Sequence, residues 1–298
     1  MTWIAVRTPD RAFEGLPDYA FTPHYIEYKG LRLHYLDVGA GDPIVLFHGE
    51  PTWSFLYRNV IPPLVAAGHR VIAPDYPGFG RSDKPTDPAF YTYERHSEFI
   101  EALLAPLDLK DATAVVQDWG GPIGLRAAVE HQEWFSRLVV MNTGLFTGTP
   151  LSEAFMAWRN FVEKTPDLPV RFIMERSMVT TWDDAVLAAY EAPFPSLEYK
   201  VGAHVFPLIV PRTRTDPGAA AMRAVVDALG GWSNPTLVMF STEDPIFNRD
   251  VAHDFARLIP GAGEPRFIEN AGHFLQEDQS AAVAQGIIDF LASLPDNR

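Results

Sequence analysis

The sequence predicts an α/β fold: a mostly parallel, doubly wound sheet flanked by helices, with a helical insertion as a cap. Three observations support this prediction. Short apolar runs typical of strands alternate with segments of helical apolar spacing, and this pattern occurs on both sides of residues 146–212. The segment 146–212 itself shows helical patterns but no clear strand. Polar residues follow several of the strands, at the edge where such sheets bind ligands.

The first half of the chain supplies a hairpin and then alternating strands and helices. Residues 24–38 alternate apolar and polar side chains around Gly30, which predicts a β-hairpin. Further strands are expected at residues 44–47, 70–73, 112–116 and 138–141. Helices are expected at residues 55–67, 94–107 and 123–131.

The alternation stops after Asn142. Helical patterns near 153–163, 170–177 and 185–190 are followed by proline-rich joints, and we expect them to cover the carboxyl ends of the strands. The alternation resumes with expected helices at 219–229, 251–258 and 281–294 and strands at 236–240 and 265–268. The predicted division is a core domain of residues 1–146 and 213–298 and a helical cap domain of residues 147–212.

Composition excludes several classes of function. The 298 residues carry a formal net charge of −14, which argues against nucleic acid or an anionic membrane as a partner. Hydrophobic residues make up 47% of the chain, enough for a large core. There is no cysteine, so a thiol nucleophile, a disulfide and a cysteine-bound metal are excluded.

Location and cofactors are expectations of the same kind. Residues 1–9 show no secretory signal, and no apolar stretch reaches about 18 residues, so we expect a cytoplasmic protein without a membrane span. The nine histidines show no metal-ligand spacing, so neither a metal nor another cofactor is expected.

Residues 116–121, which read Val-Gln-Asp-Trp-Gly-Gly, lie between a predicted strand and a predicted helix. This is the setting of a nucleophile elbow, but Asp118 stands where a lipase or esterase has serine. A carboxylate is ionised at neutral pH and needs no base to attack. Attack on a carbonyl would give an unfavourable mixed anhydride, whereas attack on a saturated carbon gives an ester that water can hydrolyse. The sequence therefore predicts an alkyl halide or an epoxide as substrate.

Asp118, Asp244 and His273 occur in the order nucleophile, acid, histidine, each after a predicted strand. His273 is expected to act as the general base that draws a proton from water, and Asp244 to orient the imidazole. Each of these residues alone is more often structural, and the three together favour catalysis. Glu243 competes with Asp244 for the acid role, and the sequence does not choose between them.

Hydrolysis of an ester on Asp118 needs backbone N–H donors for the oxyanion. The amide of Trp119, next after the nucleophile, is one candidate, and the amide of Glu50 in the loop after an earlier strand is the other. The Glu50–Pro51 bond is a candidate for the cis form. The alternative interpretation of residues 48–51 is a plain tight turn.

The leaving group separates the two substrate classes. A halide is a weak base and needs only neutral N–H donors in a dry pocket, which Trp119 and the cap residue Trp158 could supply. The alternative interpretation of Trp158 is a packing residue between cap and core. An opening epoxide needs a proton, and Tyr190 and Tyr199 also lie in the cap, so residue types alone leave this alternative open.

At this point the chain resembles the haloalkane dehalogenases of the α/β-hydrolase superfamily. The matching segments span most of the chain: residues 15–19 (Gly-Leu-Pro-Asp-Tyr), 48–54 (His-Gly-Glu-Pro-Thr-Trp-Ser), 78–85 (Gly-Phe-Gly-Arg-Ser-Asp-Lys-Pro), 116–121, and 271–277 (Ala-Gly-His-Phe-Leu-Gln-Glu). The resemblance is greatest to the subgroup that has its catalytic acid on the late strand before the histidine.

The resemblance implies an enzyme that converts a haloalkane and water to a primary alcohol, a halide ion and a proton. It implies that Asp118 is the nucleophile, Asp244 the acid and His273 the base, and that Trp119 and Trp158 bind the halide. The expected partners are a small apolar halogenated substrate and the halide, and the expected state is a monomer or a small homo-oligomer.

Two departures separate the chain from neighbouring families. Epoxide hydrolases share Asp-Trp-Gly and the histidine, but their oxyanion loop typically reads His-Gly-Phe-Pro, and Glu50 stands here at the third position. Fluoroacetate dehalogenases typically place arginine after the nucleophile, where this chain has Trp119. An epoxide hydrolase that uses the same three catalytic residues is the alternative.

Overall fold

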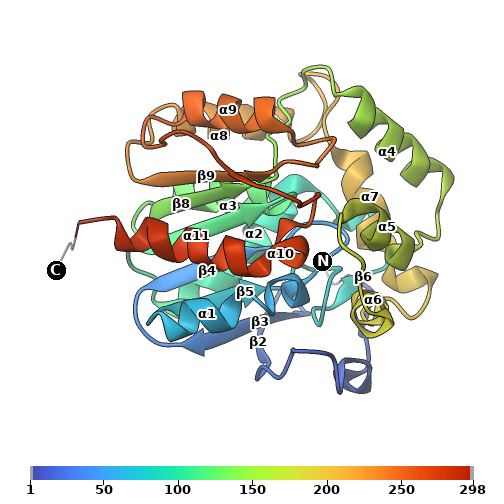
Figure 1. Cartoon of the computed structure of the whole chain (residues 1–298). Coiled ribbons are helices and arrows are strands. Elements are labelled where there is room, and N and C mark those ends of the chain that lie inside the picture. Colours follow the sequence, from blue (N-terminus) through green and yellow to red (C-terminus); the bar gives the residue numbers. More distant parts are fainter. Residues whose placement is uncertain (1–2, 296–298) are drawn as a thin grey trace.

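An eight-stranded sheet forms the centre of the computed structural model, which describes residues 3–295 (Figure 1). Its strand order is β10-β9-β8-β7-β4-β5-β3-β2. The strands from β10 to β5 are parallel, and β3 pairs antiparallel with both β5 and β2. The strands are β2 (His24–Tyr28), β3 (Leu31–Gly39), β4 (Pro43–Phe47), β5 (Arg70–Pro74), β7 (Ala112–Gln117), β8 (Phe135–Met141), β9 (Thr236–Ser241) and β10 (Arg266–Ile268). The predicted fold class is confirmed.

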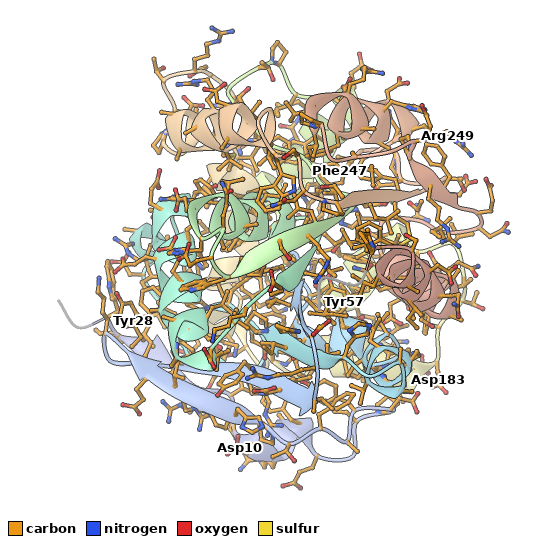
Figure 2. All side chains as sticks on the ribbon, turned by 90° about the vertical axis from the view of Figure 1, so that its left-hand side faces the viewer. Asp10, Tyr28, Tyr57, Asp183, Phe247 and Arg249 are labelled. Atoms are coloured by element: carbon orange, nitrogen blue, oxygen red, sulfur yellow. The ribbon has the colours of Figure 1, made fainter. Side chains whose placement is uncertain are left out.

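Helices cover both faces of this sheet. On one face α1 (Ile61–Ala66) packs against α11 (Ser280–Ala292), and on the other α3 (Gly120–Glu130) packs between α2 (Tyr93–Leu104) and α8 (Ala219–Leu229). Helix α9 (Arg249–Leu258) packs against β9. Every residue of β7 is buried, as expected for a parallel strand covered on both sides. In Figure 2, Tyr57 lies in the interior while Asp10, Asp183 and Arg249 lie at the periphery.

The helical segment that follows β8 lies at one end of the sheet, on the right in Figure 1. It contains α4 (Glu153–Lys164), α5 (Val170–Ser177), α6 (Asp184–Glu191) and α7 (Val201–Val205). The first and third begin with side-chain caps, since Ser152 accepts from Phe155 N and Asp183 accepts from Ala185 N. In the described residues no strand occurs between β8 and β9.

The structure differs from the sequence prediction where prolines interrupt helical spacing. Residues 55–67 do not form one helix but a 3-10 turn, η2 (Ser54–Tyr57), followed by the short α1. Pro62 and Pro63 occupy the first turn of α1, where their missing N–H groups cost nothing, and they prevent a continuous helix through this point. Likewise α2 ends at Leu104 and continues only as a 3-10 turn, η4 (Ala105–Leu107), which contains Pro106.

Several short elements were missed by the sequence prediction. Helix α7 and its flanking 3-10 turns, η5 (Leu197–Tyr199) and η6 (Phe206–Ile209), lie where only proline-rich joints were expected. Strands β1 (Ala5–Val6) and β6 (Lys84–Pro85) form a separate two-stranded sheet, and α10 (Leu275–Asp278) precedes α11. Within residues 3–295, no helix combines the length and the apolar character needed to cross a bilayer.

Candidate active site

Asp118 lies at the sharp turn between β7 and α3. Its φ of 49° is in the left-handed region, which non-glycine residues rarely adopt and which often marks functional sites. Its backbone is held on both sides, because Asp118 N donates to Asn142 O at 2.9 Å and Thr143 Oγ1 donates to Asp118 O at 2.6 Å. A Cβ at Gly120 would collide with the carbonyl oxygen of Phe47, so only glycine lets α3 start this close to β4.

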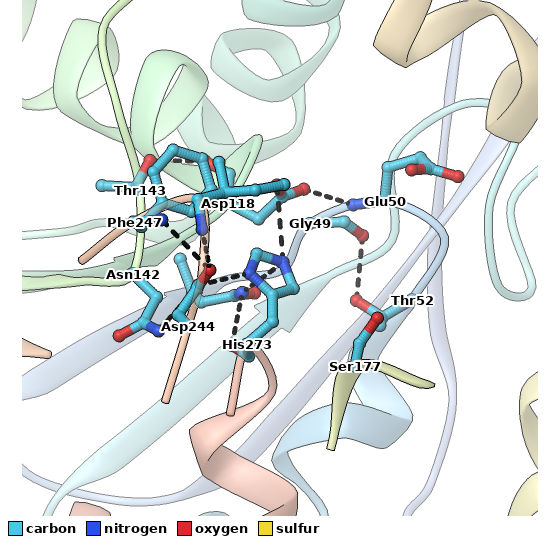
Figure 3. A network of polar contacts seen from close by, with 12 residues as sticks. Gly49, Glu50, Thr52, Asp118, Asn142, Thr143, Ser177, Asp244, Phe247 and His273 are labelled. Carbon is cyan, nitrogen blue, oxygen red and sulfur yellow. Dashed lines mark hydrogen bonds and ion pairs between the residues drawn. The ribbon is translucent and has the colours of Figure 1, made fainter. Parts of the chain in front are cut away.

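The structure brings together the three residues that the sequence singled out, from the ends of different strands (Figure 3). His273 Nδ1 lies 2.8 Å from Asp244 Oδ2, and His273 Nε2 lies 3.6 Å from Asp118 Oδ2. Glu243 points elsewhere: it is exposed, and its carboxylate accepts from Thr242 Oγ1. The geometry therefore selects Asp244 over Glu243 as the partner of the histidine.

Asp244 is fixed by more than the histidine. Its Oδ1 accepts from the amides of Ile246 and Phe247 at 2.8 and 3.0 Å, and its Oδ2 accepts from Asn142 Nδ2 at 2.9 Å. Asn142, in turn, accepts from Ser241 N at 2.8 Å, which ties the end of β8 to the end of β9. The role of Asn142 was missed by the sequence prediction, although its place directly after a buried strand was a signal.

A second missed contact involves Gln117, which directly precedes the nucleophile. Its fully buried Nε2 lies 3.1 Å from His273 Nε2 and 3.2 Å from His273 O. Because His273 Nδ1 faces the Asp244 carboxylate and donates to it, Nε2 is the accepting nitrogen and the Gln117 amide donates to it. This fixes the plane of the imidazole with its basic nitrogen toward Asp118.

The pKa values of these three groups depend on two opposing effects: burial, which disfavours the charged form, and nearby charges and hydrogen bonds, which favour it. Burial raises the pKa of Asp118, and the charge of His273 and the amides of Trp119 and Glu50 oppose this. Burial would also raise the pKa of Asp244, but His273 and two backbone amides outweigh it and hold the pKa below its ordinary value. Burial would lower the pKa of His273, but the charge and hydrogen bond of Asp244, with Asp118, raise it overall.

The loop after β4 approaches the Asp118 carboxylate with a backbone donor. Glu50 N donates to Asp118 Oδ1 at 2.7 Å. The loop is also the tight turn that the alternative interpretation described, since Thr52 N and Thr52 Oγ1 both donate to Gly49 O. The Glu50–Pro51 bond is cis. The turn and the donor are thus the same structure, because the turn aims the Glu50 amide at Asp118.

A cavity of about 180 Å³ lies over Asp118, between the ends of the strands and the helical segment. Phe146, Phe155, Ile173 and Phe247 make up much of its apolar wall. The ring of Phe247 stacks on His273, with centroids 5.7 Å apart. A small apolar molecule that enters this cavity would face the Asp118 carboxylate across a largely apolar wall.

The two tryptophans that the sequence singled out both line this cavity. Trp119 is buried and meets Phe206 edge-on, while Trp158 on α4 is half-buried and stacks on Phe161. Trp53 Nε1 donates to Ala189 O, but among the hydrogen bonds of residues 3–295 neither cavity indole N–H has a protein acceptor. Both tryptophans that carry these N–H groups line the cavity, and such donors suit a weakly basic anion.

The tyrosines expected as possible proton donors lie elsewhere. The Tyr190 hydroxyl is fully buried and donates to Glu277. Neither it nor Tyr199 lines the cavity, and no tyrosine occurs among the described lining residues. In the described part of the chain, no group of three His, Cys, Asp or Glu side chains is arranged to hold a metal ion.

Comparison with known proteins gives consistent matches. Residues 42–280 match the family model of the alpha/beta hydrolase fold. The chain is 46% identical to a haloalkane dehalogenase of Psychrobacter cryohalolentis (97% of this chain, 99% of the relative) and 48% identical to one of Mycobacterium marinum (96% and 99%). Its structure is similar to that of the tetrameric haloalkane dehalogenase DpaA from Paraglaciecola agarilytica NO2, with a TM-score of 0.91, 37% identity and coverage of 98% and 99%.

The contacts of His273 predict how its imidazole titrates. In the native protein its pKa lies above 6.5, and Asp244→Asn lowers it, because the substitution removes the charge that favours the imidazolium. NMR titration of the imidazole nitrogens measures both values. Glu243→Gln is the matched control and leaves the pKa unchanged. An unchanged pKa in Asp244→Asn would contradict the pairing.

Proposed function

The chain belongs to the haloalkane dehalogenases of the α/β-hydrolase family, and from this premise we propose which residues carry out its reaction. The enzyme hydrolyses a carbon–halogen bond, so that a haloalkane and water give an alcohol, a halide ion and a proton. The observation that carries the proposal is His273, which lies between Asp118 and Asp244 beside an apolar cavity.

In the first step an Asp118 carboxylate oxygen attacks the halogenated carbon. The carbon–oxygen bond forms as the carbon–halogen bond breaks, and the halide leaves with the bonding electron pair. Support comes from the position of the carboxylate: its Oδ1 is held by Glu50 N, and the side chain lines the cavity. The product of this step is an alkyl ester on Asp118.

In the second step water hydrolyses this ester. His273 Nε2 takes a proton from the water, whose oxygen attacks the Asp118 carbonyl carbon, and Asp244 stabilises the imidazolium. The amides of Glu50 and Trp119 stabilise the oxyanion that forms on Asp118. When the ester bond breaks, the imidazolium of His273 gives its proton to the leaving oxygen, so the alcohol leaves. Asp118 keeps one oxygen from water and loses the remaining proton of that water to solvent. The distance of 3.6 Å between His273 Nε2 and Asp118 Oδ2 supports this step, because the base lies beside the ester that the water attacks.

Trp119 and Trp158 bind the departing halide through their indole N–H groups. Support comes from their shared position on the cavity wall and from the lack of protein acceptors for both groups among the described residues. Each N–H stabilises an anion without offering it a proton, which fits a halide and does not fit an alkoxide. The chain therefore falls in the subgroup with its acid on the late strand and its second halide-binding tryptophan early in the cap, with Asp244 after β9 and Trp158 on α4.

Domain division and assembly are parts of the same proposal. Residues 147–212 form the cap domain, and residues 1–146 and 213–298 form the core domain. The chain functions as a monomer or a small homo-oligomer, and the tetrameric DpaA is compatible with the latter. A cytoplasmic location stays a prediction. The epoxide alternative is not favoured, since Tyr190 binds Glu277 instead of facing the cavity.

Replacement of the base should separate the two steps. His273→Gln still alkylates Asp118 but cannot activate water, so bromide release from 1-bromobutane stops after about one equivalent. Intact-mass analysis then shows one butyl group, and peptide mapping places it on Asp118. Asp118→Asn is the control and forms no adduct. Continued turnover by His273→Gln, or an adduct elsewhere, would contradict the assigned roles.

The halide site gives a separate prediction. Trp158→Phe keeps the ring but removes one N–H donor to the anion, a loss of about 1.5–3 kcal/mol, so the Kd for bromide rises roughly tenfold or more. Isothermal titration with sodium bromide measures this. Trp182→Phe, a substitution in the cap outside the cavity lining, is the matched control with unchanged affinity. Equal bromide affinity in Trp158→Phe and the native protein would remove Trp158 from the halide site.

A further inference from the structure

The loop that carries His273 touches the helical segment directly through the backbone. His273 N donates to Ser177 O at 2.9 Å, across the boundary between the loop before α10 and the end of α5. The contact requires glycine at position 272, because a Cβ there would lie 2.6 Å from the same carbonyl oxygen. The position of the imidazole therefore depends on where the chain after α5 lies.

One buried carboxylate joins the same two segments. Asp278, the last residue of α10, accepts from Gly272 N at 2.8 Å, the amide just before His273. It also accepts from Val179 N at 3.0 Å, from Thr180 N at 2.8 Å and from Thr180 Oγ1. Among the described residues no Lys, Arg or His side chain lies within 4 Å of this carboxylate, so these N–H and O–H donors satisfy it.

The segment that Asp278 binds also forms part of the cavity wall. Val179, which Asp278 binds, lines the cavity together with its neighbours Ser177 and Met178 and with His273. Glu277, which directly precedes Asp278, also connects the core to the helical segment. It binds Arg58 of the core, whose Nη2 lies at 3.0 Å, and Tyr190 of α6. The short α10 thus fixes the segment after α5 and the histidine loop as one hydrogen-bonded unit, with Asp278 at the point where they meet.

We propose that Asp278 is a positioning residue for His273, through which the docked cap segment 177–180 holds the imidazole in place for hydrolysis of the alkyl-enzyme. The inference rests on the proposed role of His273 as the base of the second step. Asp278 does not line the cavity and does not contact the reacting atoms. Its carboxylate acts through Gly272 N, directly before the histidine, and through Val179 and Thr180 of the segment after α5.

This role has a kinetic signature that a structural role lacks. The ratio kcat/KM reports the steps through alkylation, in which His273 takes no part, whereas kcat reports hydrolysis when that step is slow. A displaced imidazole therefore lowers kcat and KM together. A collapsed cavity would lower kcat/KM, and a partly unfolded preparation would lower kcat at unchanged KM.

The test is Asp278→Asn, which keeps the shape but offers one acceptor oxygen and turns an NH2 group toward backbone N–H donors. We expect kcat for 1-bromobutane to fall tenfold or more, kcat/KM to stay within about twofold, and butyl-enzyme to appear by intact mass during turnover. Asp216→Asn is the matched control: Asp216 accepts from Arg212 N, Thr213 N and Thr213 Oγ1, the same kinds of donor, but it has no bond to the histidine loop. It should behave like the native enzyme.

A milder variant covers the case in which Asp278→Asn fails to fold. Thr180→Val removes only the hydroxyl donor to Asp278, and a smaller fall of kcat with a parallel fall of KM is expected. Native values of kcat and KM in a folded Asp278→Asn, or in Thr180→Val where Asp278→Asn does not fold, would overturn the proposal, as would a loss confined to kcat/KM. His273→Gln run in parallel separates the two hypotheses, because trapping there shows that the base is assigned correctly whatever Asp278 does.

Discussion

The chemistry depends on keeping the Asp118 carboxylate charged while it is nearly dry. Burial disfavours the charge and raises the pKa of Asp118, and the imidazole of His273 at 3.6 Å and the amide of Glu50 at 2.7 Å oppose this rise. A carboxylate in this state has few water molecules to shed before it reaches carbon. The largely apolar cavity that Asp118 lines also contains the two tryptophans whose N–H groups are the donors proposed for the halide, so the nucleophile and the leaving group share one cavity.

The sheet supplies the precision that this constraint needs. Strands β7, β8 and β9 are parallel neighbours, and within a few residues of their ends follow Asp118, Asn142 and Asp244. Asn142 binds both Ser241 and Asp244. Strands β7 and β8 pair as far as Gln117 and Met141, at their ends. Strands β8 and β9 pair only at Leu138–Val140, so Asn142 joins their ends beyond the pairing. His273 comes from the loop after β10 at the edge of the sheet, and it receives its orientation from Asp244, Gln117 and the contact with Ser177. At the edge of the sheet the position of His273 therefore depends less on strand pairing and more on hydrogen bonds, one of them to Ser177 of the helical segment.

Local signals in the sequence were enough for the fold class, the elbow at Asp118, the donor loop at Glu50 and most elements, because periodicity and turn chemistry act over a few residues. These local signals could not choose between Glu243 and Asp244, because the two carboxylates are adjacent in the chain and differ only in the direction in which their side chains point. The contacts of Gln117, Asn142 and Asp278 join residues about 100 or more positions apart, which no local pattern encodes. Tyr190 was a candidate acid by residue type, and only the fold reveals its bond to Glu277. The prediction of a continuous helix at 55–67 was wrong because it gave the helical spacing of apolar residues more weight than the helix-breaking Pro62 and Pro63.

The most direct test of the covalent role of Asp118 is a single turnover in H2¹⁸O with enzyme in excess over 1-bromobutane. Our account predicts that the alcohol carries ¹⁶O, taken from the Asp118 carboxylate, and that the peptide containing Asp118 gains one ¹⁸O. Alcohol that is labelled in the first turnover, with an unlabelled Asp118 peptide, would show that water attacks the substrate directly and would contradict the account.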